Sequence, residues 1–303
     1  MRTKPFICWL ARALLLSLCA VVPFPIIAAD LVTLRVKPSQ TDPAIVAYDN
    51  DNLVLFAQDI STQPPLVVFL PGTSGKPSNA ANLLGVVAHQ GYRVVGLSYN
   101  DSPAIVQICP KNPWPGCSEE VRKNRTFGLE SSAATENLNA ESIVNRIVKL
   151  LIYLDKQYPN ARWGSYVKGS EPDWRRIVVA GLSQGAGMAA YIAKHREVAR
   201  VVLFSSPWDF YGRSKTLAPW LYGPSATRPD RWFAEYHRRE NTAAQIAQAY
   251  KALKIPTSNI LVFDRDLPTN LKTDRDNPYH VSTIRDIGYT PNWQILFGDP
   301  PKG

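Results

Sequence analysis

Residues 176 to 195 of the chain read Arg-Ile-Val-Val-Ala-Gly-Leu-Ser-Gln-Gly-Ala-Gly-Met-Ala-Ala-Tyr-Ile-Ala-Lys-His. The first five residues predict a strand, because they are mostly apolar and β-branched. Gln184 to His195 predicts a helix, and the turn between the two has the pattern Gly181-x-Ser183-x-Gly185. Such a turn strains the serine backbone and leaves no room for side chains at the two glycines. It therefore directs the Ser183 hydroxyl off the sheet edge, at the positive end of a helix.

Short apolar runs and helical stretches alternate along the rest of the chain. Strands are expected at residues 31–37, 53–57, 65–70, 93–99, 198–204 and 259–263, and helices at residues 79–89, 136–157 and 241–253. The first two strands are expected to form an antiparallel pair, and residues 293–297 a terminal strand. The alternation predicts an α/β protein with a mostly parallel sheet and helices on both of its faces. A single domain over residues 30–303 accommodates all of these elements.

Two stretches interrupt the alternation. Residues 102–132 are expected to be an irregular insert. Residues 207–239 are rich in Trp and Pro and are expected to form a cap-like insertion over the carboxyl ends of the strands, where open α/β sheets bind ligands. Four tryptophans are expected near the insert or the cap, where they either line an apolar pocket or hold the cap in place: Trp114, Trp208, Trp220 and Trp232.

The first 29 residues have the three parts of a secretory signal peptide. Three basic residues come first, residues 13–22 form an apolar core, and Ala29 is a small residue before the cleavage point. A membrane anchor is the alternative interpretation, but the uncharged run is seventeen residues and contains two prolines, whereas a span needs about 20. The pattern predicts a mature chain that begins at Asp30, lies in the periplasm or outside the cell, and keeps no stable membrane anchor.

The charge of the chain does not indicate a nucleic-acid partner. Lys and Arg number 34 against 25 Asp and Glu, a formal net charge of +9. Cleavage of the signal peptide removes three basic residues and leaves +6, spread over isolated pairs. No basic run is interleaved with aromatic residues, as nucleic-acid binding surfaces require.

Two of the four cysteines, Cys109 and Cys117, remain after the signal peptide is removed. Three prolines and a glycine lie between them, so the loop is tight. An exported chain meets an oxidising compartment, which favours a local disulfide over two free thiols.

These motifs together resemble the α/β-hydrolase superfamily, over most of residues 60 to 285. The resemblance rests on residues 67–75 (Val-Val-Phe-Leu-Pro-Gly-Thr-Ser-Gly), residues 91–99 (Gly-Tyr-Arg-Val-Val-Gly-Leu-Ser-Tyr) and the Gly181–Gly185 turn. Residues 204–209 and 279–283 are similar to a little-characterised bacterial subgroup of exported hydrolase-like proteins. The superfamily resemblance implies that Ser183 is a nucleophile, followed in the chain by an acid and then by a histidine.

A serine hydroxyl needs a base to attack at neutral pH. His280 follows the last expected core strand and is C-terminal to Ser183, which fits the order that the resemblance implies. His237, in the expected cap, is the alternative. His89 and His195 end helices that return to the opposite edge of the sheet, so surface or capping roles are expected for them.

Three aspartates are candidates for the acid that orients the histidine. Asp266 lies just past the strand at residues 259–263, where the superfamily usually has its acid, although only fourteen residues separate it from His280. Cutinase-like hydrolases have a similarly compact loop. Asp264 lies two residues earlier, and Asp209 follows the preceding expected strand, where some lipases have their acid.

An oxyanion that forms when serine adds to a carbonyl needs preorganised N–H donors. The N–H of Gln184, directly after the nucleophile, is one expected donor. The resemblance implies that Thr73 supplies the second, from a loop in which Gly72 and Gly75 allow close backbone approach.

The sequence thus predicts an exported serine hydrolase that cleaves small-molecule or lipid esters through a Ser-His-Asp triad and an acyl-enzyme. No metal and no cofactor is implied. A serine peptidase or amidase with the same residues is an alternative, and so is a ligand-binding protein without catalysis on the same fold.

Overall fold

An eight-stranded sheet forms the centre of the computed structural model, which describes residues 30–58, 63–128, 139–212, 216–271, 273 and 276–300. The strands are β1 (Leu31–Val36), β2 (Asn52–Ala57), β3 (Leu66–Leu70), β4 (Arg93–Gly96), β7 (Ile177–Leu182), β8 (Arg200–Phe204), β11 (Trp232–His237) and β12 (Ile260–Phe263). Their order is β1-β2-β4-β3-β7-β8-β11-β12. β2 is antiparallel to both of its neighbours, and the pairs from β4 to β12 are parallel.

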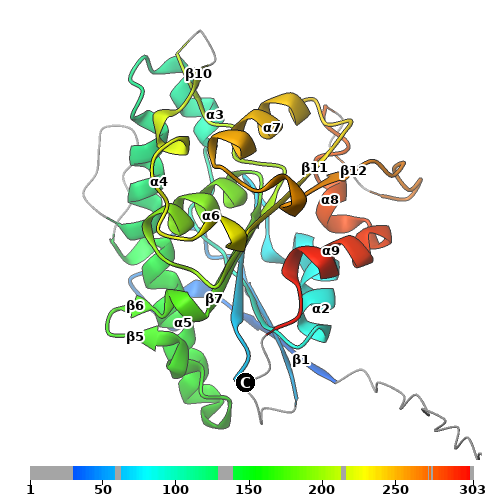
Figure 1. The fold of residues 1–303 in the computed structure, drawn as a ribbon. Helices are drawn as coiled ribbons and strands as arrows, with labels where there is room; N and C mark the ends of the chain where they lie inside the picture. Colours follow the sequence, from blue (N-terminus) through cyan, green and yellow to red (C-terminus); the bar gives the residue numbers. More distant parts are fainter. Residues whose placement is uncertain are drawn as a thin grey trace, which may run out of the picture.

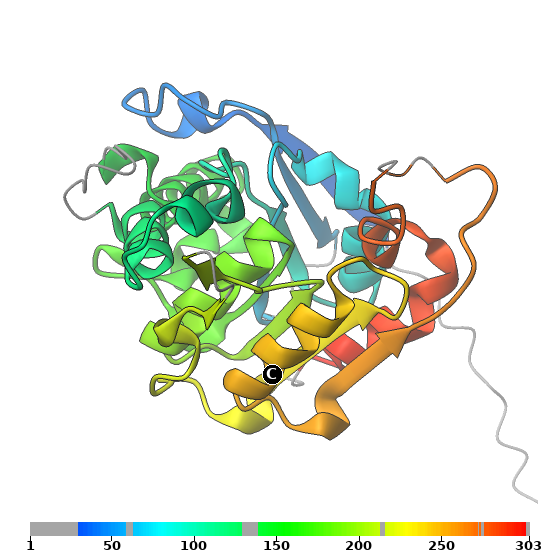
Figure 2. The same cartoon turned by 90° about the horizontal axis from the view of Figure 1, so that it is seen from above.

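Helices cover both faces of the sheet (Figures 1 and 2). One face carries α2 (Ala81–His89), α8 (Ser282–Arg285) and α9 (Thr290–Phe297), and the other carries α4 (Cys117–Phe127), α5 (Ile143–Gln157), α6 (Gln184–His195) and α7 (Ala243–Ala252). Short elements complete the chain: α1 (Pro38–Thr41), α3 (Ile105–Ile108), and the hairpins β5–β6 (Val167–Lys168 and Glu171–Pro172) and β9–β10 (Phe210–Tyr211 and Thr216–Leu217).

The central strands are apolar throughout because both of their faces are buried. In β3, Leu66, Val68 and Leu70 pack toward α5 and α6, whereas Val67 and Phe69 pack toward α2. This alternation follows from the two-residue repeat of a strand. The predicted fold class, a mostly parallel sheet between two helical layers, is confirmed.

The predicted cap at residues 207–239 is wrong in its C-terminal part, because Trp232–His237 is a core strand. β11 lies between β8 and β12 and is parallel to both. Its sequence, Trp-Phe-Ala-Glu-Tyr-His, does not read as an apolar run, since the buried residues include Glu235 and His237. The sequence predicts that the strand at residues 259–263 directly follows the strand at residues 198–204. In the sheet, β11 lies between the two.

Two other elements differ from the prediction. Residues 293–297 are not a strand but part of α9, in which Trp293, Leu296 and Phe297 are buried at the three- and four-residue spacing of a helix. The insert at residues 102–132 is more regular than expected, since it contains α4.

The predicted disulfide is confirmed. Cys109 and Cys117 are joined at a Cα–Cα distance of 5.6 Å, and the bridge is buried directly before α4. It ties the loop at residues 109–117 to the first turn of that helix.

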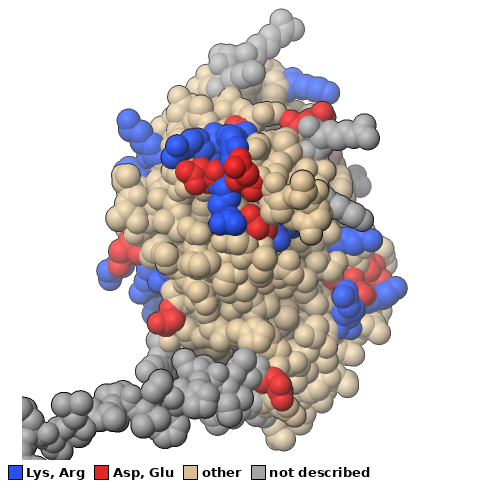
Figure 3. Space-filling view, turned by 90° about the vertical axis from the view of Figure 1, so that its right-hand side faces the viewer, with Lys and Arg blue, Asp and Glu red and all other residues tan. Residues whose placement is uncertain are grey.

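The predicted signal peptide, residues 1–29, lies outside the described residues. In the part of the chain that is described, no helix has the length and apolar character needed to cross a membrane. On the face shown in Figure 3, Lys and Arg side chains are interspersed with Asp and Glu.

Candidate active site

Ser183 occupies the tight turn between β7 and α6, at φ 55° and ψ −119°. A Cβ atom on Gly185 would lie 1.9 Å from the Leu70 carbonyl oxygen, and one on Gly181 would lie 2.5 Å from the Gly185 backbone. Both glycines are therefore required by the close approach of β3 and α6, as the sequence predicts. Ser183 and His280 line the same pocket, which has a volume of about 330 Å³ and lies beside the ends of β3 and β7.

His280 is paired with a glutamate that the sequence analysis did not consider as the acid. The Nδ1 atom of His280 lies 2.7 Å from Oε2 of Glu240, whose side chain is fully buried. Oε1 of Glu240 accepts hydrogen bonds from the Ser205 hydroxyl at 2.5 Å and from the His237 backbone N–H at 2.8 Å. An ionised carboxylate only accepts hydrogen bonds, so this arrangement places a proton on His280 Nδ1 and leaves Nε2 as the basic nitrogen.

Glu240 follows β11, and His280 follows β12. Ser183, Glu240 and His280 thus occur in this order in the chain, each after a different parallel strand. The sequence signal for Glu240 was present: it is the first carboxylate after Trp232–His237, and it was missed because that segment was interpreted as a cap.

The three predicted aspartates are not partners of His280. Asp266 is 92% exposed and binds Arg239 at 2.6 Å, and this ion pair lowers the pKa of the Asp266 carboxyl. Asp264 is also mostly exposed, and its carboxylate lies 3.8 Å from the Arg238 guanidinium. Both lie beyond β12, whereas Glu240, the partner of His280, follows β11.

Asp209 has a structural role instead. It is buried and accepts two hydrogen bonds from Arg122 of α4, at 2.6 and 2.8 Å. Trp220 donates a third hydrogen bond to it at 2.9 Å. Gly187 of α6 makes room for Arg122, because a Cβ there would lie 2.2 Å from the guanidinium. Asp209 therefore links the insert helix α4 to the segment after β8.

His237, the alternative base, is bound by backbone groups on both ring nitrogens. Nε2 lies 3.0 Å from the Arg265 carbonyl oxygen, and Nδ1 accepts the Arg239 N–H at 3.1 Å. Burial lowers its pKa, and the ring stacks on Tyr279. His89 is an exposed residue at the end of α2, and His195 packs against Tyr191 at the end of α6.

None of the four tryptophans lines the pocket at Ser183. Trp232 lies in β11 and Trp220 packs on Arg122, so these two stabilise the core and the α4 contact. Trp114 is half exposed, and Trp208 is a partly buried residue that packs against the core.

The two expected oxyanion donors lie on either side of Ser183. Gln184 is the first residue of α6, where backbone N–H groups have no partner within the helix. Thr73 lines the pocket in a turn closed by a hydrogen bond from the Gly75 N–H to the Gly72 carbonyl. A Cβ on Gly72 would lie 3.2 Å from Cβ of Ser183, which shows how closely this turn approaches the nucleophile.

Asp101 stabilises that turn by hydrogen bonds to its backbone. Its buried carboxylate accepts the Ser74 N–H at 3.1 Å and interacts with the Gly75 N–H. Ser74 is in the left-handed region, at φ 55°. Burial raises the pKa of Asp101 to about 6, while these N–H groups and the charge of Arg125 act in the opposite direction.

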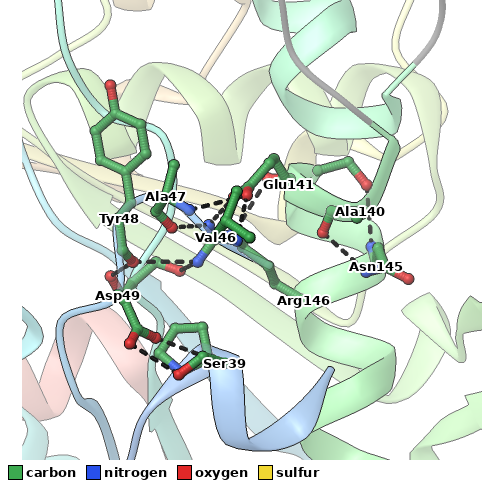
Figure 4. A network of polar contacts seen from close by, with 12 residues as sticks. Ser39, Val46, Ala47, Tyr48, Asp49, Ala140, Glu141, Asn145 and Arg146 are labelled. Carbon is green, nitrogen blue, oxygen red and sulfur yellow. Dashed lines mark hydrogen bonds and ion pairs between the residues drawn. The ribbon is translucent and has the colours of Figure 1, made fainter. Parts of the chain in front are cut away.

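The chain that leads to Asp101 is itself fixed by a buried ion pair between Glu141 and Arg146 (Figure 4). Arg146 donates to the carbonyls of Tyr48 and Ser98, and Ser98 lies three residues before Asp101. Glu141 accepts the N–H groups of residues 46 and 47. The contacts join α5 to the carboxyl end of β4.

For the ester hydrolysis that the sequence predicts, replacing Asp101 by alanine is expected to lower kcat by about 10- to 100-fold with little change in KM, because the turn that carries Thr73 loses its support. Asp101→Asn is expected to keep most of the activity, since the amide oxygen still accepts the Ser74 N–H. Steady-state kinetics of the two variants are the measurement. Equal losses in both, or a loss only in KM, would contradict this role.

The carboxyl of Glu235 is also buried and lies close to Glu240. Glu235 of β11 is completely buried, and neither of its side-chain oxygens has a hydrogen bond of good geometry among the described residues. The hydroxyls of Thr283 and Ser205 adjoin it, but they donate to the His280 carbonyl and to Glu240. Burial raises the pKa of Glu235 well above its usual range, and the charge of Glu240 raises it further. The folded chain therefore keeps the proton on Glu235 to a higher pH than the unfolded chain does.

This protonation has a consequence for stability. Glu235 ionises near pH 4.3 in the unfolded chain and only at higher pH in the folded one, so its contribution to stability is complete below about pH 4.3 and is lost as pH rises from there. As pH rises from about 5 toward the folded-state pKa of Glu235, we expect the Glu235→Gln variant to become progressively more stable relative to the unmodified chain, by at most about 1.4 kcal/mol per pH unit. Denaturant unfolding between pH 5 and 8 measures the difference, with the exposed Asp299→Asn as control. A pH-independent difference would show that Glu235 is ionised.

The strand order, the antiparallel β2 and the serine turn between β7 and α6 define the α/β-hydrolase fold. The resemblance seen in the sequence is confirmed at the level of the fold.

Comparisons with solved structures find several similar chains. The chain is similar to S-formylglutathione hydrolase (FrmB) from Staphylococcus aureus, with 8% identity, a TM-score of 0.48 and coverage of 89% of this chain and 98% of that one. It is also similar to a putative dienelactone hydrolase from Klebsiella pneumoniae, with 12% identity, a TM-score of 0.43 and coverage of 88% and 98%. A bacterial heroin esterase has 11% identity, a TM-score of 0.43 and coverage of 91% and 86%. No protein-family model and no curated protein matches the chain.

Proposed function

We propose that the chain is an exported serine hydrolase that cleaves carboxylic esters through Ser183, His280 and Glu240. One observation carries the proposal: His280, 2.7 Å from a buried glutamate, shares a pocket with a serine held on a strained strand-to-helix turn. A buried carboxylate that fixes the tautomer of a histidine beside a nucleophile is the arrangement that acyl transfer needs.

The reaction follows from the position of each group. Nε2 of His280 takes the hydroxyl proton while Ser183 Oγ adds to the ester carbonyl, and Glu240 stabilises the resulting imidazolium. The N–H groups of Gln184 and Thr73 bind the tetrahedral oxyanion. His280 then returns the proton to the leaving alcohol, which gives the acyl-enzyme. Water, deprotonated by His280, adds to the acyl carbonyl, and His280 then gives the proton to Ser183 Oγ as the C–O bond breaks and the acid is released.

The export part of the proposal has two supports. The first 29 residues have the pattern of a cleaved signal peptide. The Cys109–Cys117 disulfide is typical of chains that fold in an oxidising compartment. Fractionation of cells that express the full chain tests this: we expect protein that starts at Asp30 in the periplasm or the medium.

Matched substrates test the class of bond. We expect 4-nitrophenyl butyrate to be hydrolysed with an initial burst of nitrophenol, whereas the corresponding 4-nitroanilide is turned over far more slowly, because an amine is a poorer leaving group. Faster turnover of the anilide would replace the esterase by an amidase or peptidase. No turnover of either, together with tight binding of an ester, would favour a binding protein without catalysis.

A further inference from the structure

Glu235 is a buried acid that the proposed mechanism does not use. It lies on β11, and its side chain is completely buried. Among the described residues, the one charge that acts on it is that of Glu240, and no Lys or Arg does. Two phenols also face it, Tyr250 of α7 and Tyr289 directly before α9, and burial raises the pKa of each, so both are neutral. An ionised Glu235 would therefore be left without a compensating cation in this part of the chain.

Two hydroxyls adjoin the Glu235 carboxyl, and both donate their proton to another group. Ser205 Oγ donates to Oε1 of Glu240 at 2.5 Å. Thr283 Oγ1 donates to the His280 carbonyl at 3.1 Å. These directions are fixed, because a carboxylate and a carbonyl only accept hydrogen bonds. Each hydroxyl has a single proton and so presents only lone pairs to Glu235, which can bind either of them only as a protonated donor.

Ser205 is held in place by the strand that carries Glu235. Its backbone N–H donates to the Glu235 carbonyl at 3.0 Å, just past the paired residues of β8 and β11. The residue is fully buried and lies in the left-handed region, at φ 54°. A side chain other than glycine adopts this conformation at a cost, and such residues cluster at functional sites. The Ser205 hydroxyl is thus fixed between the two carboxyls.

The two carboxyls differ in the number of donors that bind them. Glu240 accepts from His280 Nδ1, from the Ser205 hydroxyl and from the His237 N–H. The Glu235 oxygens have no donor of good geometry among the described residues. Neighbouring carboxyls do not readily ionise together, and hydrogen bonds to the charged form favour ionisation. The charge therefore belongs on Glu240, and the proton on Glu235.

Ser205 is the better acceptor for that proton. A hydroxyl that donates to a full negative charge is polarised, which strengthens the hydrogen bond that it accepts. Ser205 donates to the Glu240 carboxylate, whereas Thr283 donates to a neutral carbonyl.

We propose that Glu235 is a positioning residue that, as a neutral acid, donates to Ser205 and through it fixes the Glu240 carboxylate. The inference rests on the proposed esterase function and concerns the same site. With Oε1 of Glu240 fixed in this way, Oε2 stays aligned with Nδ1 of His280. Glu235 touches neither the substrate nor the reacting atoms, and it keeps its proton throughout the reaction.

Kinetics of single and double variants test the link between the two residues. Glu235→Met keeps a similar side-chain length but cannot donate, and we expect it to lower kcat about tenfold with little change in KM. Ser205→Ala is expected to have a similar effect. The double variant is expected to lose no more than either single variant, because both substitutions break the same chain of hydrogen bonds. Tyr236→Phe, on the opposite face of β11, is the control and is expected to change kcat by less than about twofold.

The conservative variant Glu235→Gln tests the charge. Its amide can donate to Ser205 as the acid does, so kcat is expected to stay within about threefold. The midpoint of the acidic limb of kcat/KM is expected to be unchanged, because a neutral Glu235 adds no charge that would stabilise the His280 imidazolium. The infrared difference spectrum between the unmodified protein and Glu235→Gln at pH 7 is expected to contain the carbonyl band of a protonated acid.

Each outcome decides one part of the account. Additive losses in the double variant, or full activity in Glu235→Met, would overturn the positioning role. A carboxylate band in the infrared difference, or a shift of the acidic limb to lower pH in Glu235→Gln, would overturn the neutral acid. Thermal midpoints show which variants fold, and if Glu235→Met does not, the measurements on Glu235→Gln decide. Loss of ester turnover in every protein, the unmodified one included, would overturn the esterase, while the infrared spectrum would still establish the state of Glu235.

Discussion

Ser183→Ala is expected to lower kcat for 4-nitrophenyl butyrate by at least about a thousandfold. The substitution removes the only atom that forms the acyl-enzyme in the proposed mechanism. The remaining rate comes from the oxyanion donors and from substrate binding, which the substitution leaves in place. The nitrophenol burst is expected to disappear with the steady-state rate.

The Ser183→Ala variant is expected to keep its fold, so a loss of activity can be assigned to the missing hydroxyl. Ser183 is held by backbone bonds, from its N–H to the Phe204 carbonyl at 2.9 Å and from the Gly187 N–H to its own carbonyl at 3.1 Å. Alanine keeps both bonds, so the thermal midpoint is expected to stay within a few degrees. Ser78 lines a separate hollow together with Asp49 and Asp51, so Ser78→Ala is expected to keep full activity. Undiminished turnover in Ser183→Ala would contradict the nucleophile.

Glu240→Gln is expected to lower kcat by about 10²- to 10⁴-fold, and Asp266→Asn to change it by less than about twofold. A glutamine keeps the shape of the side chain and can still accept from Ser205 and from the His237 N–H. It carries no charge to stabilise the imidazolium, and its amide favours the tautomer of His280 that has the proton on Nε2, where the base must be free.

Asp266 provides a matched comparison, because it was the acid expected from the sequence. Its carboxylate faces solvent and pairs with Arg239. Kinetics of the two variants at several pH values measure the difference. A large loss in Asp266→Asn with near-normal activity in Glu240→Gln would show that the acid is the aspartate.

The serine and histidine could be predicted from the sequence because their signals are local. Gly181, Ser183 and Gly185 form a contiguous motif, although the contacts that require the glycines include Leu70 of β3, and the strand and helix beside the motif have clear periodicities. His280 followed from its position after Ser183 in the chain. Neither argument required knowledge of which strands are neighbours.

The acid could not be placed in the same way, since its identity depends on counting the strands of the sheet. β11 was missed because the polar residues Glu235 and His237 are buried inside it. The same strand positions Glu240, because the backbone N–H of His237 donates a hydrogen bond to the Glu240 carboxylate. Local patterns are expected to fail most often at such sites.

A fluorophosphonate probe tests the central claim most directly, because it requires no knowledge of the natural substrate. Intact-mass and peptide analysis are expected to show one adduct, on Ser183, formed rapidly in the unmodified protein and in Asp266→Asn, slowly in Glu240→Gln, and not at all in Ser183→Ala. An adduct on another residue, or no adduct on folded protein, would contradict the assignment of Ser183, His280 and Glu240 as a catalytic triad.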